Sequence, residues 1–323
     1  MLYVTTRNTQ DPFTVQRVLT TDRGTDGGFY LPFRFPKFSE SDLQKLRERN
    51  FNQRVSALLN LFFSEKLSGW DLDFTVGRYP VRLKELPHRM IMGEFWHNPQ
   101  WKYAYLEKTI SELLPGDAEG KRNWVICAIR MAILAAALLE QEELREDKID
   151  TAVTDFTVLT STWYLRKMGF PVGNIVCCCG EGDQLWDLVC LGQMKTDVRI
   201  SDNLERLIFG CGGVKEVERY LSCCAKGYVY SASDTMLQEL RKGLYISVVS
   251  DSRMENAIPN VFATHNYVLQ NDSARAYCGL MDYRAKTGVS RPALIVCDES
   301  PVCTVDVVAK RLSLSKDELL KLI

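Results

Sequence analysis

Short apolar runs alternate with predicted helices through the second half of this chain, and this alternation limits the possible folds more than any other feature. The runs at residues 175–179, 245–249 and 293–297 have the length and apolar content of buried strands. Predicted helices precede, separate and follow them. Because strands that alternate with helices usually build a parallel sheet, we expect an α/β fold with a largely parallel sheet.

Helical patterns also occupy much of the first half. Apolar residues recur at three- and four-residue spacing over residues 39–67, and Ser39 is a suitable N-cap. A second helix is predicted from residue 103 to 114, followed by a polar loop at residues 115–122. Helix then resumes from residue 123 to about 144.

Composition excludes several classes of function. The chain has 323 residues, 46% of them hydrophobic, and can bury a sizeable core in one large domain or two. A formal net charge of -1 gives no support for nucleic acid or an anionic membrane as a partner. The longest apolar run, residues 125–139, is shorter than the ~20 residues of a membrane span and contains Arg130, so it predicts a buried helix.

The 11 cysteines form no C-x-x-C pair. Cys177, Cys178 and Cys179 are consecutive, and successive residues of a strand point to opposite faces, so the three cannot easily bind one metal ion. Small buried apolar residues are the better interpretation. Because no signal-peptide pattern opens the sequence, we expect a cytoplasmic protein with reduced thiols.

Two stretches carry recognisable motifs. Residues 1–32 contain YVTTRN and RGTDGGFYLP, and residues 151–209 contain TAVTDFTVLTSTWYLRKMGFPVGN and SDNLERLIF. Both resemble threonine synthase, a pyridoxal phosphate (PLP) enzyme. The resemblance implies a tryptophan synthase β-subunit-like fold (PLP fold type II), with three α/β/α layers and a threonine synthase-type N-terminal region.

Residues 91–114 resemble the family segment that carries the catalytic lysine. Lys102 lies at the place where the family lysine forms the Schiff base with the cofactor, and His97 and Pro99 match the family's H-G-P. Two residues are missing between this motif and the lysine, and Tyr103 replaces the family's aspartate. Lys102 and His97 are therefore the candidate catalytic residues, with an exposed lysine and a structural histidine as the simpler interpretations.

The family has a further lobe after this helix, with an S-G-D-T-G motif that binds the substrate carboxylate. Here only the loop at residues 115–122 lies between two segments that both match the family. We interpret this as the loss of one lobe. The predicted domains are a threonine synthase-like N-terminal region at residues 1–90 and a reduced α/β domain at residues 91–323.

The segment that corresponds to the family's phosphate loop, P-T-G-N-F-G-D, has changed most. Thr154 and Thr157 replace its two glycines, Asp155 replaces its asparagine, and Phe156 is kept. β-Branched residues resist the positive φ angles that such loops use. A carboxylate about 4 Å from a phosphate costs roughly 4 kcal/mol per unit charge at an effective dielectric constant of about 20. We therefore expect no cofactor, although the family implies PLP if the protein is active.

Carboxylates also appear near the C-terminus, where residues 268–288 resemble the family segment that contains D-P-H-T. That core is changed to Gln-Asn-Asp-Ser and contains Asp272, and the strand at residues 293–297 leads into Asp298 and Glu299. In the family this region lies beside the cofactor ring. Another acidic group, formed by Glu181, Asp183 and Asp187, is interpreted as a solvated loop and helix start, so no metal site is predicted.

These patterns leave three hypotheses. The first is a catalytically inactive threonine synthase-like protein with a binding, regulatory or assembly role, as a homo-oligomer or with a full-length relative. The second is an active PLP-dependent lyase that uses Lys102 to convert O-phosphohomoserine. The third is a small-molecule sensor that reuses the old pocket, with Asp155, Asp272 and Glu299 as its polar lining.

Overall fold

The computed structural model describes residues 1–96, 103–116, 123–140, 148–197 and 201–323. Its strands are β1 (Leu2–Thr5), β2 (Phe13–Thr14), β3 (Tyr30–Pro32), β4 (Arg82–Leu86), β5 (Met90–Glu94), β6 (Ile149–Val153), β7 (Val172–Cys179), β8 (Gln193–Met194), β9 (Tyr230–Ser231), β10 (Leu244–Val248) and β11 (Ala293–Cys297).

The first helices are α1 (Val15–Thr20), α2 (Glu40–Arg47), α3 (Phe51–Phe63), α4 (Gly69–Val76), α5 (Tyr103–Ser111), α6 (Asn123–Leu138) and α7 (Phe156–Met168). They are followed by α8 (Gln184–Trp186), α9 (Asp202–Lys226), α10 (Asp234–Arg241), α11 (Asp251–His265), α12 (Asn271–Thr287), α13 (Val305–Leu312) and α14 (Lys316–Leu320). A π-helical turn at Asp187–Leu191 extends α8, and a 3-10 turn at Pro301–Thr304 precedes α13.

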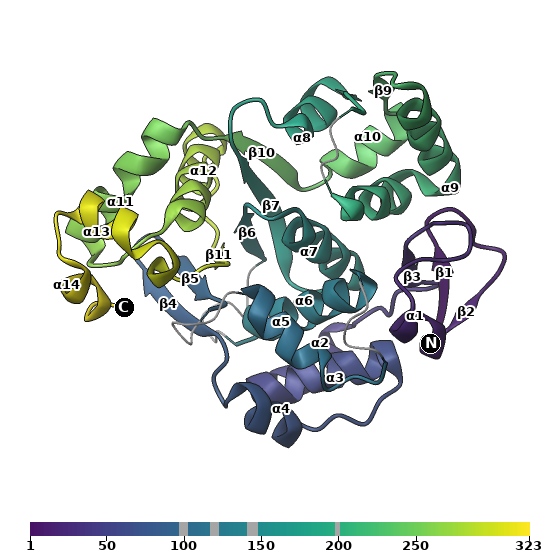
Figure 1. The fold of residues 1–323 in the computed structure, drawn as a ribbon, viewed down its shortest axis with the longest axis horizontal. Coiled ribbons are helices and arrows are strands. Elements are labelled where there is room, and N and C mark those ends of the chain that lie inside the picture. The colour runs from purple at the N-terminus through teal and green to yellow at the C-terminus, as the bar shows by residue number, and fades with distance from the viewer. Residues whose placement is uncertain (97–102, 117–122, 141–147, 198–200) are drawn as a thin grey trace.

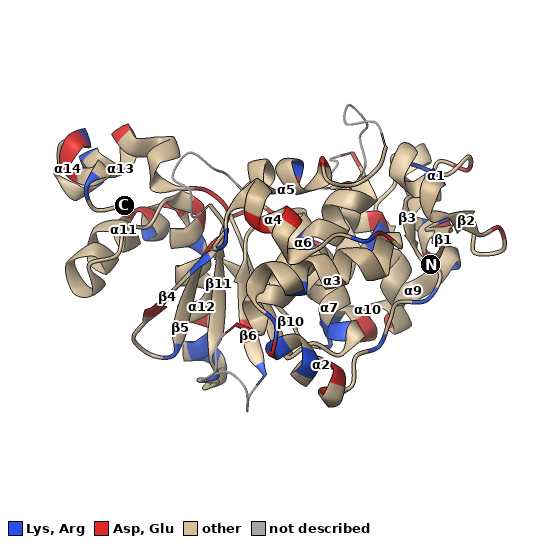
Figure 2. Cartoon of the chain, turned by 90° about the horizontal axis from the view of Figure 1, so that it is seen from below, with Lys and Arg blue, Asp and Glu red and all other residues tan. Residues whose placement is uncertain are grey.

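A six-stranded sheet forms the centre of the molecule, in the order β10-β7-β6-β11-β5-β4. Every neighbouring pair is parallel except β4 and β5, so the predicted parallel α/β fold is confirmed. Helices α6 and α7 lie on one side of the sheet and α11 to α13 on the other, and the two chain termini lie at opposite ends of the molecule (Figures 1 and 2).

The central strands are buried on both faces, which explains their continuous apolar sequences. In β11, Leu294 and Val296 belong to the core on one face of the sheet, whereas Ile295 and Cys297 belong to the core on the other. Cys177 and Cys178 divide between the same two cores. The interpretation of this cysteine run as buried strand residues is therefore confirmed.

The N-terminal segment forms a small antiparallel sheet, β2-β1-β3, which rests on the helical part of the molecule. The Tyr3 hydroxyl donates a 2.6 Å hydrogen bond to the carbonyl of Phe62 in α3. Buried Arg206 in α9 donates from Nε to the carbonyl of Tyr30 at 2.9 Å. The proposed domain boundary at residue 90 remains a prediction, and β4, which precedes it, forms an edge of the main sheet.

One local prediction was incomplete and another was wrong. The helical pattern at residues 39–67 forms two helices, because Asn50 caps α3 and interrupts the pattern after α2. The glycine-rich segment Gly-Cys-Gly-Gly at residues 210–213, whose composition predicts a plain turn, is instead a kink within α9. There Gly213 takes φ 72° and ψ -171°, which an L-residue resists, while the chain on either side stays helical. No helix among the described residues is long and apolar enough to cross a membrane.

Gly279 sets how closely α12 approaches the sheet. A Cβ atom at this position would lie 2.9 Å from the Cβ atom of Cys178 on β7. We expect Gly279→Ala to lower the free energy of unfolding by about 1–3 kcal/mol, although alanine is the better helix former, because the helix must move away from the sheet. Urea unfolding measures this loss. Lys286→Ala, at an exposed position of the same helix, should change the free energy by less than about 0.5 kcal/mol. Equal effects at both positions would contradict the role of Gly279.

Candidate functional site

A pocket lies at the carboxyl edge of the parallel strands, where ligands bind in open α/β sheets. Thr154 and Asp155 directly follow β6, and Asp298 and Glu299 directly follow β11. The pocket has a volume of about 350 Å³ and is lined by Tyr103, Ala104, Arg130, Thr154, Asp155, Asp272, Asp298 and Glu299.

Asp155 occupies the start of helix α7. Its Oδ1 atom accepts a hydrogen bond from the backbone N–H of Val158 at 2.9 Å, so the side chain caps the helix. A helix N-terminus otherwise offers its free N–H groups to an anion. In this chain the anion is supplied by the helix's own cap. None of the positive-φ residues of the described chain falls within residues 153–158, so this turn lacks the backbone conformation of a glycine-rich cradle.

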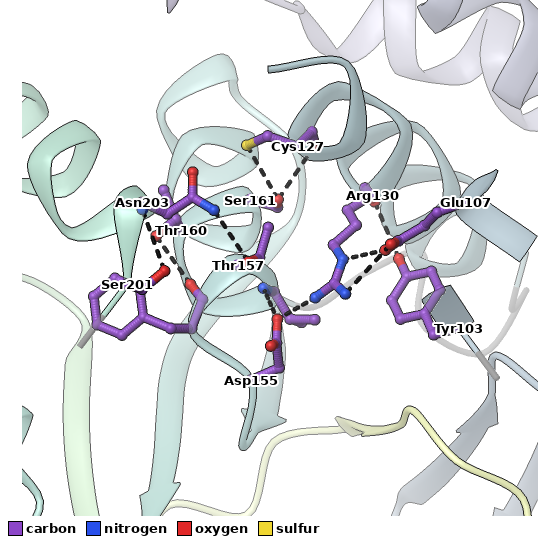
Figure 3. Close-up of polar contacts among 12 residues, drawn as sticks. Tyr103, Glu107, Cys127, Arg130, Asp155, Thr157, Thr160, Ser161, Ser201 and Asn203 are labelled. Carbon is purple, nitrogen blue, oxygen red and sulfur yellow. Dashed lines mark hydrogen bonds and ion pairs between the residues drawn. The ribbon is translucent and has the colours of Figure 1, made fainter. Parts of the chain in front are cut away.

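Arg130 connects Asp155 to a second buried carboxylate. The guanidinium, on α6, pairs through Nη1 with Asp155 Oδ1 and through Nε with Glu107 of α5 (Figure 3). It also lies 4.9 Å from the ring centroid of Tyr103, whose hydroxyl donates to the Arg130 carbonyl at 3.4 Å. Arg130 therefore ties the second turn of α5, through Glu107, to the start of α7, through Asp155.

Burial changes the pKa values of Glu107 and Arg130. It raises the pKa of Glu107 to about 7, even though Arg130 acts in the opposite direction. For Arg130, burial lowers the pKa, but the neighbouring carboxylates of Glu107 and Asp155 raise it further, so that the net change is upward. The guanidinium thus stays charged, while Glu107 exchanges its proton near neutral pH.

Asp298, another acid of the pocket, connects the end of β11 to the start of α5. Its backbone carbonyl accepts a 2.9 Å hydrogen bond from the N–H of Tyr103, which joins the end of β11 to the start of α5. Its carboxylate atom Oδ1 is buried and has no hydrogen-bond partner within the part of the chain that the structure describes. Burial raises the pKa of this carboxyl well above its usual value, again against the effect of Arg130.

Thr157, in the first turn of α7, contacts helix α9. Thr157 Oγ1 accepts a 3.0 Å hydrogen bond from the Nδ2 amide of Asn203, which lies at the start of α9 (Figure 3). Asn203 also accepts from the buried guanidinium of Arg206 through Oδ1. The side chain of Thr157 therefore connects α7 to α9.

The structure brings several predicted site residues together. Asp155, Asp272 and Glu299, which the sensor hypothesis grouped, line one pocket with Thr154. Phe156 begins α7 and does not line it. Lys102 and His97 lie outside the described residues, so both remain predictions.

The sequence analysis missed Arg130 and Glu107 as parts of this site, and it noted Asp298 beside the cofactor region without including it in the polar lining. One signal was present, since Arg130 is the single charge within the apolar run at residues 125–139. A lone arginine on a buried helix requires carboxylate partners. Which carboxylates meet it depends on the fold and could not be read from spacing.

Comparisons with known proteins agree with the resemblance. Residues 2–78 match the family model described as threonine synthase N terminus. The structure is similar to PLP-bound threonine synthase from Brucella melitensis, with a TM-score of 0.79 and 15% sequence identity over 97% of this chain and 92% of that chain. This chain has the threonine synthase fold.

Two further threonine synthase structures support this conclusion. The yeast enzyme matches with a TM-score of 0.83 and 14% identity, over 99% of this chain and 93% of that chain. The Escherichia coli enzyme matches with a TM-score of 0.73 and 12% identity, over 98% and 92%. No curated protein matches the sequence. The predicted PLP fold type II architecture is therefore confirmed at the level of the threonine synthase fold.

The raised pKa of Glu107 predicts how stability depends on pH. The folded state holds this proton up to a pKa of about 7, against a value of 4.5 for the free side chain. Because the folded state binds the proton more tightly, Glu107 should lower the free energy of unfolding by about 3 kcal/mol as the pH rises through this window. Glu107→Gln removes this dependence, so the variant should gain stability relative to the parent as the pH rises.

Urea unfolding between about pH 5 and pH 8 measures both slopes. Glu85→Gln, on edge strand β4, is the control, because Glu85 is exposed and should leave the slope unchanged. Parallel pH profiles for the parent and Glu107→Gln would show that Glu107 is ionised throughout the range.

Proposed function

We propose that this protein is a non-catalytic relative of threonine synthase that does not bind PLP tightly and acts by binding, regulation or assembly. The observation that carries the proposal is the position of Asp155. This carboxylate caps α7 and pairs with Arg130, and it lies in the segment that resembles the family's phosphate loop.

The residues of this site do not suit a phosphate group. A phosphate at the start of α7 would compete with Asp155 for the helix N–H groups and for the guanidinium of Arg130. It would also enter a pocket lined by two further acidic side chains, those of Asp272 and Glu299. The negative charges of these side chains and of the phosphate would repel one another strongly in a partly buried site.

The proposed role in binding, regulation or assembly is supported by the scaffold that the chain shares with threonine synthase. The scaffold of the threonine synthase fold is kept through both layers of helices, whereas the polar groups at the strand ends interact with one another. Fold and chemistry are separable, because a site depends on a few side chains and a fold on the whole core. An assembly with a second copy of the chain or with a full-length relative is part of the proposal.

A PLP titration tests this proposal directly. We expect no saturable visible absorbance band of an internal aldimine, even at a large excess of PLP, and no borohydride-fixed adduct at Lys102 in peptide mass mapping. A saturable band that is lost in Lys102→Ala would contradict the proposal and favour the active lyase. An assay with O-phosphohomoserine would then test that activity.

Asp155→Asn tests the stated cause. The amide keeps a capping oxygen but removes the charge, which frees Arg130 for an anion and should raise the affinity for PLP by up to about a thousandfold. Equilibrium dialysis with PLP measures the change. Asp197→Asn, at an exposed position outside the pocket, is the matched control and should leave the affinity unchanged. If Asp155→Asn binds PLP no better than the parent, Asp155 is not the obstacle.

A further inference from the structure

Helix α4 and the residues after it carry the most exposed large hydrophobic side chains of the described chain. Phe74 is 94% exposed, Trp70 is 75% exposed, and Tyr79, just beyond the helix, is 74% exposed. The buried residues of α4 are Leu72 and Val76. Single exposed rings are ordinary on a protein surface, but three of them within ten residues form a patch that is typical of an interaction site.

The three rings lie close together on the outside of the molecule. Trp70 and Phe74 are four residues apart in α4, so they are neighbours on the helix surface. Trp70 and Tyr79 line one pocket, together with Phe51, and this pocket has a volume of about 290 Å³. Helix α4 packs against α3 at the periphery of the molecule (Figure 1). The patch therefore presents a projecting ring, Phe74, next to a hollow that Phe74 itself does not line.

Exposed charges of both signs accompany the rings. Asp71 accepts hydrogen bonds from the backbone N–H and the hydroxyl of Ser68, and these bonds lower the pKa of its carboxyl. Asp71 is therefore ionised at neutral pH. Arg78 is also exposed and lines the pocket. A surface with an acid and a base beside apolar rings can pair each charge with the opposite charge of an identical surface.

We propose that this face is the contact between two copies of the chain, in a two-fold dimer in which Phe74 of each copy enters the pocket of the other. The proposal gives a surface to the assembly that is part of the proposed function, and it rests on that part. A two-fold contact requires a surface that is complementary to itself. Here the projecting ring and the pocket that can receive it belong to the same face of one chain. The pocket is larger than the cavity of about 150 Å³ that holds a benzene molecule.

The exposed area of the rings is close to what a dimer needs. An aromatic side chain buries roughly 150–250 Å² when it is fully covered. At the exposed fractions of Trp70, Phe74 and Tyr79, three rings from each copy would together contribute on the order of 1,000 Å². Specific interfaces bury about 1,200–2,000 Å² in total, and polar residues around the rings supply the remainder. We therefore expect a dimer of modest affinity that dissociates on dilution.

Other occupants of this face fit less well. A small molecule in the pocket would leave Phe74 exposed to water, because Phe74 does not line the pocket. An anionic membrane surface would meet the carboxylates of Asp71 and Asp73 beside the rings. A second copy of the chain covers the projecting ring and fills the pocket at the same time.

Analytical ultracentrifugation of the full chain tests the proposal. The mass should increase with concentration from 36.9 kDa toward twice that value. Phe74→Ser should weaken the self-association at least about tenfold, because it removes an aromatic anchor of the contact. Tyr228→Ser is the matched control, since it removes a ring that is 63% exposed and lies outside the patch, and it should leave the self-association unchanged. A chain that stays monomeric up to millimolar concentration would overturn the proposal.

A second patch variant separates a lost contact from a lost fold. Phe74 is almost fully exposed, so Phe74→Ser should unfold at the same urea concentration as the parent when both are monomeric. Tyr79→Ser should also weaken the dimer, because Tyr79 lines the pocket. A dimer that Phe74→Ser and Tyr79→Ser leave intact would use another surface and would overturn the proposal.

Photo-cross-linking locates the contact. With benzoylphenylalanine in place of Phe74, illumination should give a product of twice the chain mass, with the cross-link at the pocket residues of the second copy. A product of single-chain mass with an internal cross-link would mean that the chain covers its own patch. That result would also overturn the proposal.

This proposal and the proposed function fail in different ways. A monomeric chain that does not bind PLP would remove the dimer and leave a non-catalytic role in binding or regulation. A borohydride-fixed PLP adduct at Lys102 would contradict the proposed function, whatever mass the chain shows in the ultracentrifuge.

Discussion

The ion pair of Arg130 with Glu107 and Asp155 is the constraint around which this structure is arranged. Arg130 belongs to a helix that is otherwise apolar and central to the core, and an unpaired charge there would be very unfavourable. Helices α5 and α7 must therefore bring carboxylates to it. This requirement fixes the ends of both helices beside the carboxyl edge of the sheet, where the pocket lies.

The same ion pair occupies groups that a phosphate site would use. In a site built for a phosphate, the helix terminus and a basic side chain act on the ligand. Here both act on Asp155. The guanidinium of Arg130 and the carboxylates of Glu107 and Asp155 are thus used within the chain. A shared fold and a different set of polar groups at the strand ends are thus compatible within one sheet.

Much of the architecture could be predicted from the sequence. Residues 293–297 form β11, as expected, because a short run of apolar residues is typical of a strand buried on both faces. The N-cap at Ser39 was also correct, since capping depends on residues close in sequence. The division of residues 39–67 into two helices was missed, because Asn50 interrupts the periodicity with only a local signal.

The candidate site was less accessible to sequence reasoning. Asp155 was recognised through the motif that it interrupts, and Asp272 and Glu299 through their place beside another. The partners Glu107 and Arg130 are 23 residues apart, and their encounter depends on how two helices pack. Residues that act through long-range packing leave no fixed spacing in the sequence.

The cap of α7 has a consequence for how the chain persists in a cell. A ligand that binds only the folded state adds to stability in proportion to its supply, so an enzyme with a loosely held cofactor is most vulnerable when that cofactor is scarce. In this chain the N-terminus of α7 is capped by Asp155, which belongs to the polypeptide and is therefore always present. With no PLP bound, as proposed, the stability of the folded chain should not depend on the supply of PLP.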